Sequence, residues 1–263
     1  MKKDGHIHTP FCPHGTMDAL TGYVEKAILL GYEEITFTEH APLPKGFIDP
    51  TPKKDSAMKL EDLDIYMEEI ERVKAIYRHD IIINTGLEID YIEGYERETT
   101  YFLNQYGPFL DDAILSVHFL KNGDEYDCLD YSPENFANMV MKYGSIEHLY
   151  RVYYQTVLRS VQEDLGAYKP KRIGHMTLVK KFKKKFPIAN ENKEDILTIL
   201  SAIQLQGYEL DYNSAGFQKP LCRESYPPNW VVKEALEMGI PLIYGSDAHR
   251  IKDLGQNREQ MLI

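Results

Sequence analysis

Short apolar runs typical of β-strands alternate with amphipathic helical patterns along this 263-residue chain, and this alternation limits the possible folds most strongly. We predict seven strands, at residues 5–8, 34–38, 81–87, 113–117, 172–174, 208–212 and 241–244. The helical patterns lie at 17–30, 60–77, 96–105, 133–143, 146–165, 194–206 and 229–238. Repeated βα units of this kind predict a parallel sheet, either closed into a barrel or doubly wound.

Charge and cysteine content narrow the class of protein. The formal net charge is −11, and such an acidic balance disfavours nucleic-acid binding, which needs basic patches that neutralise phosphates. The three cysteines are far apart and predict no disulfide framework, so we expect a cytoplasmic protein. The first residues lack the apolar core of a signal peptide, and no apolar stretch approaches the length of a membrane span.

Seven of the nine histidines lie at or just beyond the C-terminal end of a predicted strand. They are His6, His8, His14, His40, His118, His175 and His249. Catalytic groups of α/β barrels collect at this edge because the βα loops converge there. A hydrogen-bonded structural role is the simple alternative for any one histidine. Seven convergent imidazoles, however, need protons or metal ions to coexist.

The spacing of these residues indicates a metal site. In His6-Ile7-His8 both imidazoles point the same way, because side chains on a strand alternate. Asp247-Ala248-His249 repeats this pattern after the last strand, and Glu88 ends the third strand, where an unpaired buried carboxylate is costly. Imidazoles and carboxylates that meet at one edge are suitable ligands for zinc, iron or manganese.

Other chemistries find little support in the sequence. There is no phosphate-binding glycine-rich loop and no G-x-S-x-G nucleophile motif. Cys12 lies among the predicted ligands, but we expect it to pack in its loop, because His14 is the better-placed donor. The lysine-rich segment 180–185 is interpreted as a solvated surface, and an anchor for phosphate or for a partner is the alternative.

Six short motifs together resemble those of the polymerase and histidinol phosphatase (PHP) superfamily. They are His6-Ile7-His8, Thr38-Glu39-His40, Gly86-Leu87-Glu88, Ser116-Val117-His118, Ile173-Gly174-His175 and Gly245-Ser246-Asp247-Ala248-His249. Within this superfamily the chain looks most similar to the stand-alone histidinol-phosphate phosphatases. That branch is favoured by Asp4-Gly5-His6-Ile7-His8-Thr9, Cys12-Pro13-His14-Gly15, Asn213-Ser214-Ala215-Gly216, Arg223 and Tyr226-Pro227.

The resemblance implies a distorted (β/α)7 TIM-like barrel, with residues 1–263 as a single PHP-type domain that holds three divalent metal ions. By position, the first ion would be held by His6, His8, Glu88 and Asp247. The second would be held by Glu88, His118 and His175, with Glu88 bridging the two ions. The third would be held by His14, His40 and His249.

The implied activity is hydrolysis of L-histidinol phosphate to L-histidinol and phosphate in histidine biosynthesis. Our hypothesis for this phosphoric monoester hydrolase is direct attack by a metal-bridging hydroxide, without a phosphoenzyme. Asp247 or His249 would orient the water or protonate the leaving oxygen. A general PHP phosphoesterase or an exonuclease acting on another phosphate ester is the alternative. A metal-binding regulatory protein and an amidohydrolase of similar barrel plan are more distant alternatives.

A phosphate dianion favours an arginine fork, and two arginines are candidates. Arg159 is similar in position to the family's phosphate-contacting arginine, and Arg223 is the second candidate; an ordinary surface ion pair is the alternative for each. The loop 41–55, rich in proline, is interpreted as a lid, an element that recognises the substrate amine, or a plain connection.

The formal net charge of −11 leaves out bound metal ions, which would add positive charge at the predicted site. Three divalent ions together with Glu88 and Asp247 would make a centre of about +4 within an acidic protein. We therefore expect a small phosphorylated amino-alcohol as substrate, and neither nucleic acid nor membrane as partner. The sequence assigns no oligomeric state.

Overall fold

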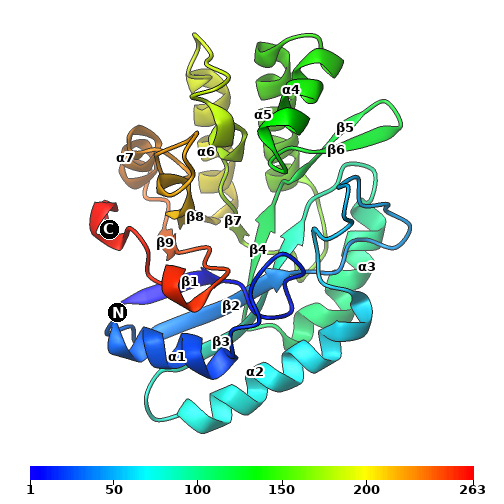
Figure 1. Cartoon of the computed structure of the whole chain (residues 1–263). Helices are drawn as coiled ribbons and strands as arrows, with labels where there is room; N and C mark the ends of the chain where they lie inside the picture. The colour runs from blue at the N-terminus through cyan, green and yellow to red at the C-terminus, as the bar shows by residue number, and fades with distance from the viewer.

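The seven predicted strands form one sheet in the order β1-β2-β3-β4-β7-β8-β9 in the computed structural model, which describes residues 1–263 (Figure 1). Every neighbouring pair in this sheet is parallel. The strands are β1 Lys3–Ile7, β2 Glu34–His40, β3 Ile82–Asp90, β4 Asp112–Ser116, β7 Arg172–Ile173, β8 Glu209–Asn213 and β9 Leu242–Gly245. Each predicted range overlaps one of them, so the strand predictions are confirmed.

The two edges of this sheet meet just beyond β9. Ile7 forms a parallel bridge with Ala248, and the His8 amide donates to the Ala248 carbonyl at 2.9 Å. The Asp247 amide donates to the His6 carbonyl at 2.8 Å. The sheet is therefore a near-closed barrel, which confirms the predicted distorted (β/α)7 fold. This closure brings the residues after β9 against the C-terminal end of β1.

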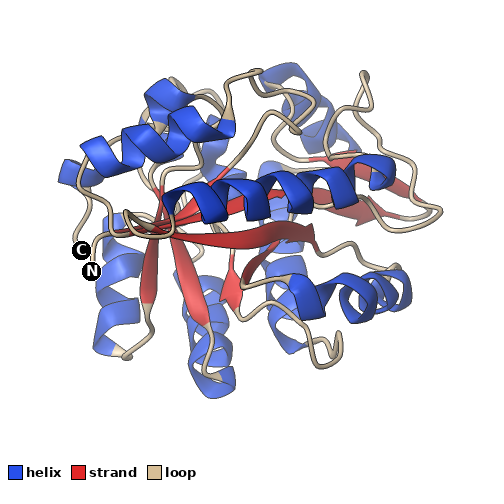
Figure 2. Ribbon diagram, turned by 90° about the horizontal axis from the view of Figure 1, so that it is seen from below, coloured by secondary structure: helices blue, strands red, loops and turns tan.

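Seven α-helices lie on the outside of the strands (Figure 2). They are α1 Leu20–Leu29, α2 Leu63–Tyr77, α3 Glu96–Tyr106, α4 Pro133–Lys142, α5 Ile146–Gln162, α6 Lys193–Gln206 and α7 Asn229–Glu237. The Ser132 and Ser145 side chains cap α4 and α5, and α6 ends at Gly207, whose φ of 66° suits glycine. None of these helices is long and apolar enough to cross a membrane.

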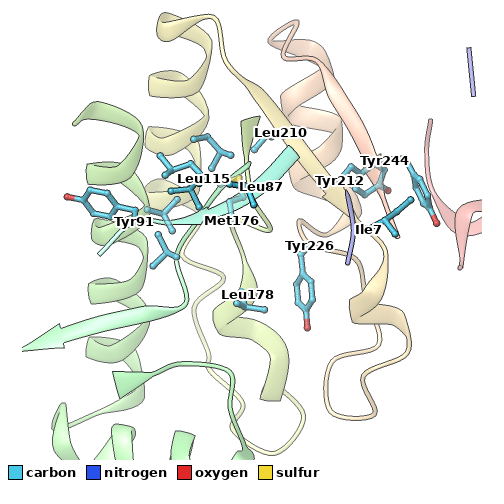
Figure 3. Packing of buried hydrophobic residues seen from close by; sticks show 14 of the residues in the cluster. Ile7, Leu87, Tyr91, Leu115, Met176, Leu178, Leu210, Tyr212, Tyr226 and Tyr244 are labelled. Atoms are coloured by element: carbon cyan, nitrogen blue, oxygen red, sulfur yellow. The ribbon is translucent and has the colours of Figure 1, made fainter. Parts of the chain in front are cut away.

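The main apolar core contains 55 buried residues. Leu87, Leu115 and Leu210 lie beside the helices that cover the sheet (Figure 3). The core residue Ile7 is fully buried and stands between His6 and His8 in the sequence. In the same way the core residue Leu87 directly precedes Glu88. Successive strand residues therefore serve the core and the polar interior in turn, as the two-residue period of a strand requires.

A small antiparallel hairpin of β5 Phe119–Asn122 and β6 Glu125–Cys128 follows β4, and the sequence did not predict it. Gly123 makes the tight turn at φ 62°. The hairpin strands are short and half polar, so they lack the apolar run that identified the barrel strands. The hairpin follows the C-terminal end of β4, and its residues Phe119 and Cys128 line the cavity at this end of the barrel.

Candidate metal centre

A cavity of about 760 Å³ opens at the C-terminal ends of the strands. Most of the predicted ligands line it, namely His14, His40, Glu88, His118, His175, Asp247 and His249. His6 and His8 are fully buried beneath this lining. The structure therefore brings all nine predicted metal ligands together at the predicted edge of the barrel.

Glu88 lies at the middle of the cluster and reaches imidazoles with both carboxylate oxygens. Its Oε2 is 3.4 Å from His6 Nε2 and 3.1 Å from His40 Nδ1. Its Oε1 is 3.0 Å from His175 Nε2 and 3.8 Å from His118 Nε2. The parallel register pairs His40 of β2 with Glu88 of β3, which explains why residues distant in sequence meet here.

Asp247 joins the cluster from the residues that follow β9. Its Oδ1 is 3.2 Å from His8 Nε2 and 3.8 Å from His6 Nε2. The Asn213 amide group donates to its Oδ2 at 3.1 Å. Asp247 has a φ of 53°, in the left-handed region that costs a non-glycine residue energy, and such strain is commonly kept at functional sites.

The hydrogen bonds of three histidines fix which ring nitrogen carries the proton. Carboxylates face their Nδ1 atoms at 2.9 Å in His6, 3.1 Å in His8 and 2.8 Å in His118. A neutral imidazole that donates from Nδ1 presents a bare lone pair at Nε2. The Nε2 atoms of these histidines therefore point into the cluster as acceptors.

In the neutral rings these acceptors would face one another without a donor between them. Nε2 of His6 is 3.2 Å from Nε2 of His8, and Nε2 of His118 is 3.1 Å from that of His175. Converging lone pairs of imidazoles and carboxylates repel unless a proton or cation joins them. Two of the groups able to hold an ion are His6, His8, Asp247 and His40, Glu88, His118. The donor set thus fits divalent cations.

The pKa values reflect the same concentration of charge. Although burial opposes it, Asp211, Glu88 and Asp247 raise the pKa of His6 well above its ordinary value. Burial works against ionisation of Glu88, yet His6, His40 and His118 hold the pKa of its carboxyl well below the usual range. Protons on the imidazoles thus balance the negative charge of the carboxylates. Bound cations would take over this role, and metal binding would displace those protons.

His14 and His249 form the outer part of the cluster. The His14 ring centroid is 5.2 Å from that of His40 and 5.1 Å from that of His249. Nε2 of His249 is buried without a hydrogen-bond partner, so no other group of the protein occupies this nitrogen. Cys12 is also buried, and its sulfur is grouped with ligand atoms of His8, His40 and His249 within 4.8 Å.

Three carboxylates that support the centre had no role in the sequence analysis. Asp211 contacts Nδ1 of His6, Glu39 contacts Nδ1 of His8, and Asp90 contacts Nδ1 of His118. Such carboxylates fix the tautomer and orientation of metal-binding histidines. The signal was faint: Asp90 lies two residues after Glu88, on the same face of β3, and Asp211 lies on β8.

Neither predicted phosphate-binding arginine lines the cavity. Arg159 on α5 pairs with Glu93 and is half exposed, which is the alternative that the sequence left open. Arg223 has a φ of 64° and donates to the Phe217 carbonyl. A role in phosphate binding therefore stays a prediction for both. The cations that line the cavity are Lys53, Lys181, Lys219 and Arg250.

The lysine-rich segment is only in part the solvated surface that the sequence favoured: Lys184 and Lys185 are exposed, but Lys180 and Lys181 are not. Lys180 is 4% exposed and bonds Glu191 at 2.6 Å, within the 3₁₀ helix Leu178–Phe182. Lys181 lines the cavity and bonds Asp130 at 2.7 Å. The charge of Asp130 is stabilised by this lysine, which overcomes burial and lowers the pKa of the carboxyl. Part of the segment therefore belongs to the cavity wall.

A model of the PHP domain family matches residues 4–215, so the chain belongs to the PHP family. A histidinol-phosphatase of Bacillus subtilis is 50% identical over 263 residues, which cover 99% of this chain and 98% of that protein. The crystal structure of a candidate histidinol phosphatase from Listeria monocytogenes superposes with a TM-score of 0.94 at 40% identity, covering 98% of this chain and 99% of that one.

A more distant structure shares the fold. The histidinol phosphate phosphatase of Lactococcus lactis, solved with zinc, L-histidinol and phosphate, gives a TM-score of 0.68 at 23% identity. The match covers 96% of this chain and 90% of that one. Matches that span nearly the full length of both proteins make the whole barrel, rather than a fragment of it, the shared unit.

Proposed function

We propose that this protein hydrolyses L-histidinol phosphate to L-histidinol and phosphate, a metal-dependent phosphomonoesterase step in histidine biosynthesis. The observation that carries the proposal is the joining of nine ligand-type side chains at one cavity in a chain 50% identical to a histidinol-phosphatase. The full-length match supports transfer of the activity. We also propose that residues 1–263 form one PHP-type domain, because β9 completes the sheet beyond residue 215. We propose a cytoplasmic location for the protein as well.

We propose that the centre holds three divalent ions of zinc, iron or manganese. Oε2 of Glu88 lies near His6 and His8 and its Oε1 lies near His118 and His175, which supports a bridging role between a first and a second ion. His14, His40 and His249 would hold the third, and their neighbouring rings support this assignment. Borderline divalent ions favour such mixed imidazole and carboxylate sites.

Bound ions of this kind lower the pKa of a shared water and neutralise phosphate oxygens. Glu88 and Asp247 would stay negatively charged in the substrate complex and so would hold the metal ions at the floor of the cavity. Asp247, fixed by Asn213, would orient the attacking water from its Oδ1 side. His249 donates from Nδ1 to the Asp247 carbonyl at 3.1 Å, so its buried Nε2 would carry the lone pair that holds the third ion, and His249 would thereby help to position the leaving oxygen.

Lys219 is our candidate for direct contact with the phosphate. It lines the cavity, and no carboxylate forms an ion pair with it, whereas Lys181 is paired with Asp130. An unpaired ammonium group can exchange water for phosphate oxygens without breaking an existing bond. Lys53, which also lines the cavity, would add long-range attraction.

Steady-state kinetics on histidinol phosphate, other small phosphomonoesters and single-stranded DNA would test the proposal. We expect the highest kcat/KM for histidinol phosphate, and elemental analysis to find divalent ions in the purified protein. Comparable rates on unrelated esters would instead favour a general phosphoesterase, and preference for DNA an exonuclease. A single turnover in oxygen-18 water should place one label in the released phosphate; a trapped phosphoprotein would contradict direct attack.

A further inference from the structure

The segment 41–58 lines one part of the cavity and contacts His14 through a single backbone carbonyl. We infer that Asp49 is a positioning residue for the third metal site: it ties this segment into the shape that presents a carbonyl to His14. The inference rests on the proposed function, since it takes His14 as a metal ligand. It assigns a role to a carboxylate that lies outside the cavity lining.

His14 needs such support because its own surroundings hold it weakly. It is exposed, in a segment without helix or strand between β1 and α1. Its only side-chain hydrogen bond joins Nδ1 to the Asp55 carbonyl at 2.8 Å. A carbonyl can only accept, so Nδ1 donates and Nε2 keeps its lone pair for a metal. The Asp55 carbonyl thus sets both the tautomer and the direction of the ring.

Asp49 fixes the position of that carbonyl. It is 8% exposed, and its Oδ1 accepts from the Thr51 amide at 2.8 Å. Its Oδ2 accepts from the Ser56 amide at 3.1 Å and from the Ser56 hydroxyl at 2.7 Å. Ser56 is the residue next to Asp55, so one carboxylate ties both ends of the turn that carries the carbonyl.

The geometry inside this turn requires such a tie. Lys54 adopts a φ of 53°, which is unfavourable for a residue with a side chain. Its ammonium group donates to the Asp49 carbonyl at 3.1 Å. Burial raises the pKa of Asp49, but the hydrogen bonds from Ser56 and Thr51 outweigh it and lower the pKa below its ordinary value. The carboxylate therefore stays charged at neutral pH and binds all three donors.

The segment is also anchored on both sides of the turn. The Phe47 ring packs edge-on against Tyr95 at 5.3 Å, Phe119 at 5.1 Å and Tyr126 at 5.1 Å between ring centroids. On the other side the Met58 amide donates to the His40 carbonyl at 3.2 Å. With both flanks fixed, loss of Asp49 would release only the turn between them.

The test is metal binding by Asp49→Asn, which keeps the size of the side chain but faces an NH₂ group toward the donors of Thr51 or Ser56. We expect the variant to hold one ion fewer than the wild type at limiting metal. The missing ion should return when free metal is raised about 10- to 100-fold. Equilibrium dialysis with elemental analysis measures the stoichiometry, and the Co²⁺ absorption spectrum reports on the ligands.

Two further variants make the result decisive. His14→Ala should lose the same ion, and Asp49→Asn combined with His14→Ala should lose nothing more, since both changes act through one ligand. Asp124→Asn, an exposed carboxylate on the hairpin turn, is the matched control and should bind metal as the wild type does. Additive losses in the double variant, or full stoichiometry in Asp49→Asn, would overturn the inference.

The same experiment separates this inference from the proposed ligand set. If His14→Ala keeps every ion at limiting metal, the assignment of His14 as a ligand fails, and the inference fails with it. If His14→Ala loses an ion and Asp49→Asn does not, only the role of Asp49 fails. Thermal unfolding of the metal-free proteins shows whether Asp49→Asn also weakens the fold, an effect that added metal would not reverse.

Discussion

The two ligands at the C-terminal end of β1 and the ligand in the loop between β1 and α1 differ in how firmly they are held. His6 and His8 are fully buried, and each has a carboxylate on Nδ1. His14 is exposed and rests on one backbone carbonyl supplied by another loop. The ligands around Glu88 are thus held by the barrel, whereas the position of His14 depends on two loops.

This difference has a physical reason. A barrel strand is fixed on both edges by backbone hydrogen bonds and on one face by the core, so its side chains keep their direction even when one contact is lost. A loop residue depends on the few bonds it makes. The sites at the strand ends should therefore bind metal most tightly, and changes to the two loops that carry and contact His14 should affect the third ion alone.

The largest expected effect comes from Glu88→Gln. The change removes the charge that lies between the imidazoles proposed for the first and second ions, so we expect loss of at least one ion and a fall in kcat/KM of about 10³-fold or more. Kinetics and elemental analysis measure the two effects, and circular dichroism checks the fold. Near-normal metal content would show that Glu88 does not bridge the ions.

Asp211→Asn should have a smaller effect, because Asp211 orients His6 without reaching a metal position. We expect metal affinity or kcat/KM to fall about 10- to 100-fold, and excess metal to restore part of the activity. Asp64→Asn, on the exposed face of α2, is a control expected to behave as the wild type. A loss at Asp211 as large as that at Glu88 would contradict the division between ligands and supporting carboxylates.

The sequence predicted the strands of the barrel well because their signals are local. The β-branched run at 81–87 and the other apolar runs mark buried strands whatever their neighbours are. Hairpin residues such as Lys121 and Glu125 gave no such run, because their pairing depends on the loop folding over the cavity. Closure through Ala248 likewise depends on the curvature of the whole sheet.

The candidate site divides along the same line. Histidines are rare enough that seven at strand ends are informative, and their spacing on β1 follows from the strand period. Acidic residues are common here, 41 in all, so nothing singled out Asp211, Glu39 or Asp90 before their partners across the sheet were known. Asp49 acts on a residue 35 positions away through a turn that no short motif describes.

The smallest expected effects distinguish two candidates for phosphate binding outside the metal centre. Lys219 faces the cavity without an ion pair, so Lys219→Ala should raise KM for histidinol phosphate about tenfold and change kcat little. Arg159 is paired with Glu93 outside the lining, so Arg159→Ala should change kcat/KM by less than about threefold. The reverse order would mean that Arg159 leaves Glu93 and turns inward when substrate binds, and would restore the role predicted from the sequence. Inorganic phosphate inhibition checks the same contact, because only a residue that touches phosphate should weaken inhibition in parallel with KM. Since neither residue supports a metal ligand, both variants should keep the wild-type metal content, in contrast with every change made within the centre.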